Sequence, residues 1–187
     1  REAEFGYFLT DGVKELLLHR SEMLVDSLAI GDEVVVFLYT DGQGRLAATM
    51  FTPALMYGQA GWLRVIAEEP DLGLFLDLEI QRDLFLPKSE LPASKEEWPR
   101  LGDYLFVEVT RDRQGRLLGK LADTALLVKD YTPGIPRIRN QMLVATVYRL
   151  FPDGAFLISG EGYLLFLPRS EMETPVRLGQ EVSVRIT

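Results

Sequence analysis

The sequence contains no cysteine among its 187 residues. Disulfide bonds, thiolate metal sites and cysteine nucleophiles are therefore excluded, and we expect the protein to act in the reducing cytoplasm. The longest β-like apolar run, Val34–Tyr39, is far shorter than the roughly 18 residues that cross a bilayer. No basic start followed by an apolar stretch marks a secretory signal. We therefore expect no membrane partner.

Histidine is almost as scarce, because His19 is the only one in the chain. A metal centre built from several histidines is thereby excluded. The sequence also contains no glycine-rich nucleotide loop and no cluster of His, Cys and carboxylate residues, and it shows no Ser-His-Asp arrangement. We predict that the protein is not an enzyme and needs no cofactor or metal.

The net charge of −8 argues against a nucleic-acid ligand, since phosphate contacts use Lys and Arg. The charge is unevenly distributed, however. Eight basic residues lie in the stretch 111–149, where only Asp112, Asp123 and Asp130 oppose them. From charge alone, a solvated basic loop and a phosphate-binding track are equally good interpretations of this stretch.

An ordered set of features occurs three times along the chain and indicates an internal repeat. Each copy has a glycine followed, after a fixed interval, by a Ser-Glu pair. The interval is 15 residues in the first copy and 16 in the other two, measured from Gly6 to Ser21, Gly73 to Ser89 and Gly154 to Ser170.

A Gly-Asp or Gly-Gln pair then precedes a stretch of alternating apolar residues, which is typical of a strand with one face in a core. Glycines predict hairpin turns at residues 41–44 and 113–115. Each Ser-Glu pair predicts a helical turn that the serine hydroxyl caps. The predicted inward-facing residues are Val34, Val36 and Leu38, then Leu105, Val107 and Val109, and finally Val182, Val184 and Ile186.

The three copies predict three domains, at residues 1–52, 60–122 and 140–187. Only the middle copy has a full set of strands, because the first copy lacks its opening strand and the third lacks its last. We therefore expect the chain to be part of a longer protein. The connector before the third copy contains Tyr131–Pro136, whose prolines disfavour a helix.

The segments FGYFL, LLLHRSEM and TDGQGRLAAT, in this order, resemble the S1 domain, an RNA-binding module with the OB fold. The resemblance covers most of the chain. It implies an all-β fold of tandem five-stranded Greek-key barrels, the outer two of which are truncated. An array of divergent copies is most similar to the conserved virulence factor B family of bacterial RNA-binding regulators, in which a winged-helix domain follows the array.

The resemblance also implies a ligand, which is single-stranded RNA or, alternatively, single-stranded DNA, bound across strands two, three and five. A bulge at Gly6 is expected to bring Phe5 and Phe8 to one face of the barrel. In the later copies Leu72 and Asp153 replace the first aromatic residue, and prolines replace the histidine. The matching residues are Phe5, Phe8, His19, Arg20, Asp41 and Arg45 in the first copy, Phe75, Lys88 and Arg116 in the second, and Phe156 and Arg169 in the third.

Two functions remain open on the sequence. The resemblance implies a non-catalytic RNA-binding protein in post-transcriptional gene regulation, with the ribosome or another protein as a further partner. The net acidity and the loss of base-stacking residues in the later copies fit a protein-interaction scaffold of degenerate OB barrels instead. Phe8, Phe75 and Phe156 are also compatible with burial in the barrel cores.

Overall fold

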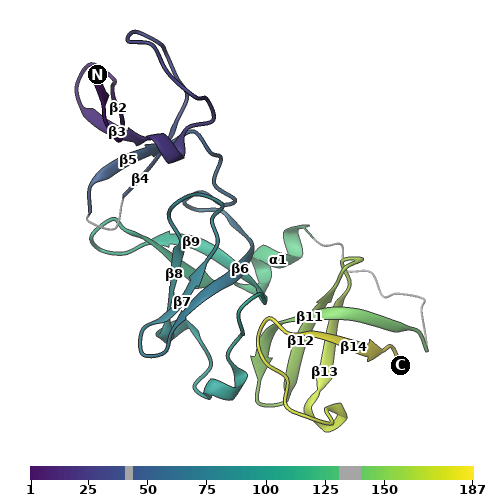
Figure 1. The fold of residues 1–187 in the computed structure, drawn as a ribbon. Helices are drawn as coiled ribbons and strands as arrows, with labels where there is room; N and C mark the ends of the chain where they lie inside the picture. Colours follow the sequence, from purple (N-terminus) through teal and green to yellow (C-terminus); the bar gives the residue numbers. More distant parts are fainter. Residues whose placement is uncertain (41–43, 131–139) are drawn as a thin grey trace.

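Three β-sheets follow one another along the chain and form an elongated row, with the N-terminus in the first copy and the C-terminus in the third (Figure 1). The computed structural model describes residues 1–40, 44–130 and 140–187. The prediction of an all-β fold with tandem OB-type barrels is confirmed. Within these ranges, no helix is long and apolar enough to cross a membrane.

The second copy forms a closed barrel of five strands. These strands are β6 (Ala60–Glu69), β7 (Gly73–Leu76), β8 (Leu84–Pro87), β9 (Tyr104–Arg111) and β10 (Leu117–Leu121). The strand order is β10-β9-β6-β7-β8, and β10 lies against β8, which closes the sheet.

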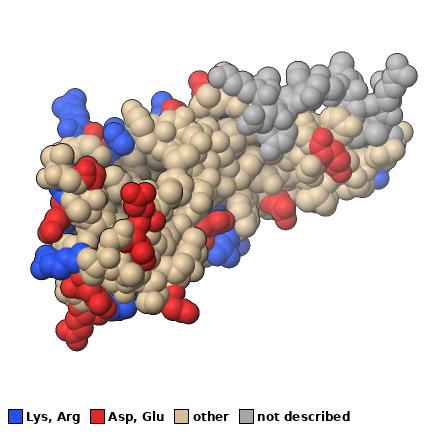
Figure 2. Space-filling view, turned by 90° about the horizontal axis from the view of Figure 1, so that it is seen from above, with Lys and Arg blue, Asp and Glu red and all other residues tan. Residues whose placement is uncertain are grey.

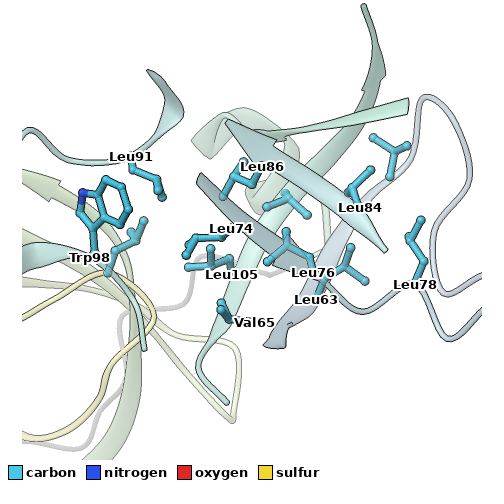
Figure 3. Packing of buried hydrophobic residues seen from close by; sticks show 13 residues of the cluster. Leu63, Val65, Leu74, Leu76, Leu78, Leu84, Leu86, Leu91, Trp98 and Leu105 are labelled. Carbon is cyan, nitrogen blue, oxygen red and sulfur yellow. The ribbon is translucent and has the colours of Figure 1, made fainter. Parts of the chain in front are cut away.

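Leucines fill the interior of this barrel, and Figure 3 shows them converging from the strands and the adjoining loops. The predicted inward residues of β9 are confirmed, because Leu105, Val107 and Val109 are at most 1% exposed. Trp98 is buried with this cluster, and its indole N–H donates to the Pro92 carbonyl oxygen at 2.8 Å. The second copy therefore has a large core of its own.

The first copy contains β1 (Glu2–Ala3), β2 (Gly6–Thr10), β3 (Glu15–His19), β4 (Phe37–Thr40) and β5 (Leu46–Thr49). Their order is β1-β2-β3-β5-β4, and β3 pairs with β5 in parallel. The short β1 pairs with the start of β2, and Ala3 lies opposite Gly6. The last two residues of β6 pair with the start of β7 in the same way, with Glu69 opposite Gly73. The sequence predicts that the first copy lacks its opening strand. Among the described residues, β1 corresponds to the last two residues of that strand, and the rest of it is not present.

Strand β4 begins at Phe37, later than the alternation of apolar residues predicts. Val34 and Val36 are half-buried, and the prediction that Leu38 faces the core is wrong, because Leu38 is 54% exposed. In the second copy the first half of β9 pairs with β6. The described part of the first copy has no strand that could pair in this way, so the backbone before Phe37 stays outside the sheet.

The third copy contains β11 (Met142–Phe151), β12 (Gly154–Ser159), β13 (Leu164–Pro168) and β14 (Glu181–Arg185), in the order β13-β12-β11-β14. Two of its predicted inward residues are confirmed, since Val182 and Val184 on β14 pack against the buried cluster of this sheet, whereas Ile186 follows the end of β14 and is half-buried. The described residues include no third-copy strand at the position that β10 has in the second copy.

The connector between the second and third copies contains helix α1 (Thr124–Asp130), which the sequence analysis did not predict. The segment Tyr131–Pro136 lies outside the described residues. Across the junction, the Leu178 N–H donates to the Glu97 carbonyl oxygen at 2.9 Å. A buried cluster formed by Phe106, Ala122, Leu127, Tyr148 and Ile158 joins the two copies. The domain limits 1–52, 60–122 and 140–187 stay a prediction.

Each Ser-Glu pair lies in a short 3-10 turn, as predicted. The turns are η1 (Arg20–Glu22), η2 (Lys88–Glu90) and η4 (Arg169–Glu171), and a further turn, η3, spans Lys95–Glu97. The prediction that serine caps them is wrong, because the serine is the second residue of the turn and not the residue before it. His19 precedes η1, and its Nδ1 accepts from the Ser21 N–H at 3.3 Å.

The hairpin turn predicted at residues 113–115 is confirmed, and Gly115 has a φ of 82° there. This value lies in the left-handed region, which glycine adopts without steric cost. The turn predicted at residues 41–44 lies mostly outside the described residues.

The glycine that opens the second strand of each copy lies directly against the third strand. A Cβ atom on Gly6 would lie 2.2 Å from the Leu18 carbonyl oxygen. The same distance is 2.1 Å for Gly73 and Leu86, and 2.3 Å for Gly154 and Leu167. No side chain fits into this contact, which explains why the glycine occurs in all three copies.

We expect Gly73→Ala to lower the free energy of unfolding by about 1–3 kcal/mol, because the new methyl group forces β7 and β8 apart. Urea denaturation followed by tryptophan fluorescence measures this loss, since both tryptophans lie in the second copy. Gly160→Ala is the control, as a Cβ there meets no atom within 4 Å. Equal stability of the two variants would contradict the prediction.

Candidate nucleic-acid interface

A row of aromatic side chains crosses the outer face of the third sheet. Phe166 on β13 and Arg149 on β11 both lie opposite Phe156 on β12. Residues directly opposite one another in antiparallel strands project to the same face. The ring centroids of Phe156 and Phe166 are 5.2 Å apart, and Phe151 meets Phe156 edge-on, also at 5.2 Å. We call Arg149, Phe151, Phe156 and Phe166 the aromatic row.

A bulge in β11 places the cation of this row. The register of β11 against β12 shifts between Val147 and Arg149. Strict alternation from the fully buried Val147 would turn Arg149 into the core, whereas the extra residue, Tyr148, returns Arg149 to the outer face. Tyr148 itself is buried against the second copy, and burial raises its pKa.

The aromatic row is accessible to a ligand. Phe166 is 47% exposed and Phe151 is 39% exposed, while Phe156 between them is half-buried. The Arg149 guanidinium carbon lies 6.0 Å from the Phe151 ring centroid. The row therefore presents flat apolar surfaces beside one positive charge.

The second copy has only part of this arrangement. Phe75 and Phe85 lie opposite one another on β7 and β8, with ring centroids 5.3 Å apart. The position of Arg149 is taken by Ala67, and the position of Phe151 is taken by Glu69. The face of the second copy thus has an aromatic pair without the adjacent cation, and it carries a negative charge instead.

In the first copy, Phe5 and Phe8 do meet, with ring centroids 6.4 Å apart and a T-shaped geometry. The predicted bulge at Gly6 is wrong, because β2 pairs with β3 without a shift in register. Phe5 lies in the turn between β1 and β2, outside the alternation of the strand, and is 49% exposed. The Arg1 guanidinium carbon lies 4.3 Å from the Phe8 centroid, so one face of this ring is covered.

The cation beside the third strand occupies the same backbone position in each copy. In the first copy, the Arg20 N–H donates to the Phe5 carbonyl oxygen at 3.0 Å. The equivalent bonds join Lys88 to Leu72 and Arg169 to Asp153, each at 2.8 Å. These bonds agree with the alignment of the three copies that the sequence predicted.

The side chains at and next to these positions differ in the hydrogen bonds that they form. Arg20 Nη2 lies 2.8 Å from a Glu2 carboxylate oxygen, and this hydrogen bond raises the pKa of Arg20. His19 is exposed, and its Nδ1 lies 2.7 Å from the Ser21 hydroxyl. Lys88 and Arg169 are also exposed. A phosphate would have to compete with Glu2 for Arg20.

The acid and arginine expected at the last hairpin are paired in the second copy. Arg116 Nε donates to Asp112 Oδ2 at 2.7 Å. Burial alone would raise the pKa of Asp112, but hydrogen bonds from Arg116 and from the Gln114 N–H outweigh it, and the pKa is lowered. In the first copy Arg45 is exposed next to β5, and Asp41 lies outside the described residues.

Sequence reasoning missed the aromatic residue on the third strand. Phe85 and Phe166 both stand three residues before the cation of their copy, in the shared motif Phe-Leu-Pro. The first copy has Leu17 at this position, opposite Phe8. The recurrence of Phe-Leu-Pro in two copies is the sequence signal for this residue, and the first copy, which carries the fullest S1 motif, lacks it.

The charged side chains in Figure 2 do not form a patch of one sign. On the face that this view shows, acidic and basic side chains are interspersed over a mostly uncharged surface. This face as a whole therefore provides no strong electrostatic attraction for a polyanion.

Family models match all three copies. The model described as S1 domain matches residues 1–51, the CvfB first S1-like domain matches residues 60–120, and the second domain of the virulence regulatory factor CvfB matches residues 127–187. Each model thus matches one of the three β-sheets.

Proteins similar to this chain extend beyond it. The chain is 37% identical to the uncharacterized protein YitL of Bacillus subtilis, over 99% of this chain and 62% of that protein. It is 36% identical to conserved virulence factor B of Staphylococcus epidermidis and 34% identical to that of Staphylococcus aureus, in each case over 90% of this chain and 57% of the relative. The chain therefore spans about three-fifths of the length of these relatives.

A solved structure shares the fold. The crystal structure of a multidomain protein with nucleic acid binding domains from Streptococcus pneumoniae TIGR4 matches with a TM-score of 0.83 and 31% identity. The match covers 99% of this chain and 65% of that one. This chain is therefore a tandem array of S1-type, OB-fold domains like those of the conserved virulence factor B proteins.

Proposed function

We propose that this chain is a non-catalytic protein that binds single-stranded RNA, mainly through the aromatic row on the third copy. The observation that carries this proposal is the row itself, in which the partly exposed Phe166 and Phe151 lie on either side of Phe156 and Arg149 lies beside them. The solved structure similar to this chain is described as having nucleic acid binding domains, which supports the proposal.

The chemistry of the row suits unpaired bases. A base stacked on an aromatic side chain contributes about 1–3 kcal/mol whatever its identity, and an arginine beside it adds a phosphate or cation–π contact. In a duplex the bases are already stacked on one another and cannot reach the rings. OB grooves accordingly accept splayed single strands. Single-stranded DNA presents the same bases and is expected to bind as well.

The first and second copies contribute less in this proposal. A ligand on the first copy has to displace Arg1 from Phe8 and Glu2 from Arg20. A ligand on the second copy meets Glu69 where the third copy offers Phe151. The family model that matches residues 127–187 is described as the second domain of a virulence regulatory factor, so we further propose a role in post-transcriptional regulation in the cytoplasm, with the ribosome or another protein as a further partner.

A protein-interaction scaffold is the second candidate. Leu38, Leu46 and Tyr57 are each more than 40% exposed and line one hollow at the junction of the first and second copies. Such apolar exposure suits a protein partner better than a polyanion. Binding of RNA by the third copy does not require this surface.

Titration of a fluorescently labelled oligouridine of about 12 nucleotides, followed by anisotropy, tests the proposed function. We expect a dissociation constant in the micromolar range at ~50 mM salt, with a log–log salt slope of about −0.7 for each phosphate contact. A duplex of the same length should bind more weakly. Absence of binding to the single strand at this salt concentration would favour the scaffold.

A further inference from the structure

A groove of about 690 Å³ lies where the second and third copies meet. One wall is formed by residues 89–93 and the end of β10 in the second copy, and the other by the end of β11 in the third. Its lining brings together three cations from separate segments, Lys120, Arg149 and Arg169. Lys120 and Arg149 come from the basic stretch 111–149, and the fold places them together.

The groove continues directly from the aromatic row. Phe151 lines the groove and also meets Phe156 edge-on at 5.2 Å. Arg149 likewise lines the groove and lies opposite Phe156. A strand that stacks on Phe166 and Phe156 and runs on past Phe151 therefore enters the groove without crossing another element of the third copy.

The walls of the groove are held in place by the junction between the copies. The buried cluster around Leu127 and Tyr148 spans both copies. Arg177 of the third copy pairs with Asp103 of the second at 3.3 Å, with both side chains largely buried. The groove is thus already formed before a ligand arrives, which reduces the ordering cost of binding.

The charges in the groove leave a cation available to a phosphate. Two carboxylates, Glu90 and Glu97, also line it. Glu90 Oε2 accepts from the Leu121 N–H at 3.2 Å, so this carboxylate is already engaged by the backbone. Arg149 lies 3.9 Å from Asp123, whereas the exposed Lys120 forms no ion pair with any residue that the structure describes.

We propose that this groove is a second subsite, which receives the phosphates of a single strand whose bases stack on the aromatic row. This inference rests on the proposed function and adds to it the path of the strand and a contact from the second copy. It predicts that affinity depends on ligand length, because only a strand longer than the aromatic row reaches Lys120.

Binding of two oligouridines, of about 4 and about 12 nucleotides, to Lys120→Gln tests the groove. For the longer strand we expect affinity to fall about three- to tenfold and the log–log salt slope to shrink by about 0.7, as for the loss of one phosphate contact. The shorter strand should bind as it does to the unmodified chain. Lys14→Gln, which removes the same charge from an exposed turn of the first copy, should leave both affinities unchanged.

The outcomes separate this inference from the proposed function. If the unmodified chain binds neither strand, the proposed function fails. If it binds both, but Lys120→Gln weakens neither or weakens both equally, the aromatic row stands and the groove is not a subsite. Lys120 is exposed, so unchanged circular dichroism and thermal midpoint are expected for the variant, and they confirm that it is folded.

Discussion

Replacing Phe156 and Phe166 together by alanine is expected to weaken binding of a single-stranded oligouridine of about 12 nucleotides by about 30-fold or more. Each ring offers a platform for one base, and the lower end of the stacking range, about 1 kcal/mol for each base, already gives about 2 kcal/mol in total. The two rings lie side by side on neighbouring strands. Their loss leaves Arg149 with no adjacent stacked base to position the phosphate.

Matched variants make this test specific to the third copy. Phe75→Ala with Phe85→Ala removes the equivalent pair of the second copy, and we expect a smaller loss, because Ala67 and Glu69 replace Arg149 and Phe151 there. Tyr57→Ala removes an exposed aromatic residue that lies outside both faces, and it should have no effect. An equal loss from the two phenylalanine pairs would show that the third copy is not the main site.

Leu86→Ala is expected to destabilise the second copy by about 2–5 kcal/mol, the range for removing a large buried side chain and leaving a cavity. Leu86 is fully buried on β8 and lies among the leucines of the largest cluster, as Figure 3 shows. Both tryptophans belong to the second copy, and Trp98 lies in the same cluster. Urea denaturation followed by tryptophan fluorescence therefore reports this loss directly.

Leu18→Ala is the matched control, because Leu18 holds the equivalent position on β3 of the first copy and is also fully buried. Leu18 belongs to none of the buried clusters found among the described residues. We expect this variant to leave the tryptophan transition nearly unchanged. A shift as large as that of Leu86→Ala would mean that the first two copies unfold as one unit.

The sequence was sufficient to predict the repeat and the closed second barrel, because these depend on local constraints. Gly6, Gly73 and Gly154 each meet a carbonyl oxygen of the next strand, and no other residue fits. Leu105, Val107 and Val109 alternate along β9 because this face of the strand lines the interior of the barrel. Constraints of this kind act on single positions, so they remain visible in divergent copies.

The candidate site could be predicted only in part, because its geometry depends on contacts between distant segments. Arg149 faces the ligand side only because β11 has a bulge at Tyr148, and its sequence shows only a run of mixed residues there. Phe166 gains its role from pairing with Phe156 across two strands. Lys120 and Arg149 line one groove only because the two copies meet at this junction. The bulge at Tyr148 and the approach of Lys120 to Arg149 have no fixed spacing in the sequence, whereas the ten-residue interval between Phe156 and Phe166 recurs between Phe75 and Phe85.

Because β4 begins only at Phe37, the first and second copies differ in how readily the backbone opens locally to solvent. The residues before Phe37 and the first half of β9 carry similar alternating apolar residues, but only the first half of β9 pairs with a neighbouring strand, β6. Amide hydrogens are protected from solvent exchange by pairing and burial, not by hydrophobicity alone. Amide protection is therefore expected to be lower for the residues before Phe37 than for the first half of β9, although the first copy carries the fullest S1 motif.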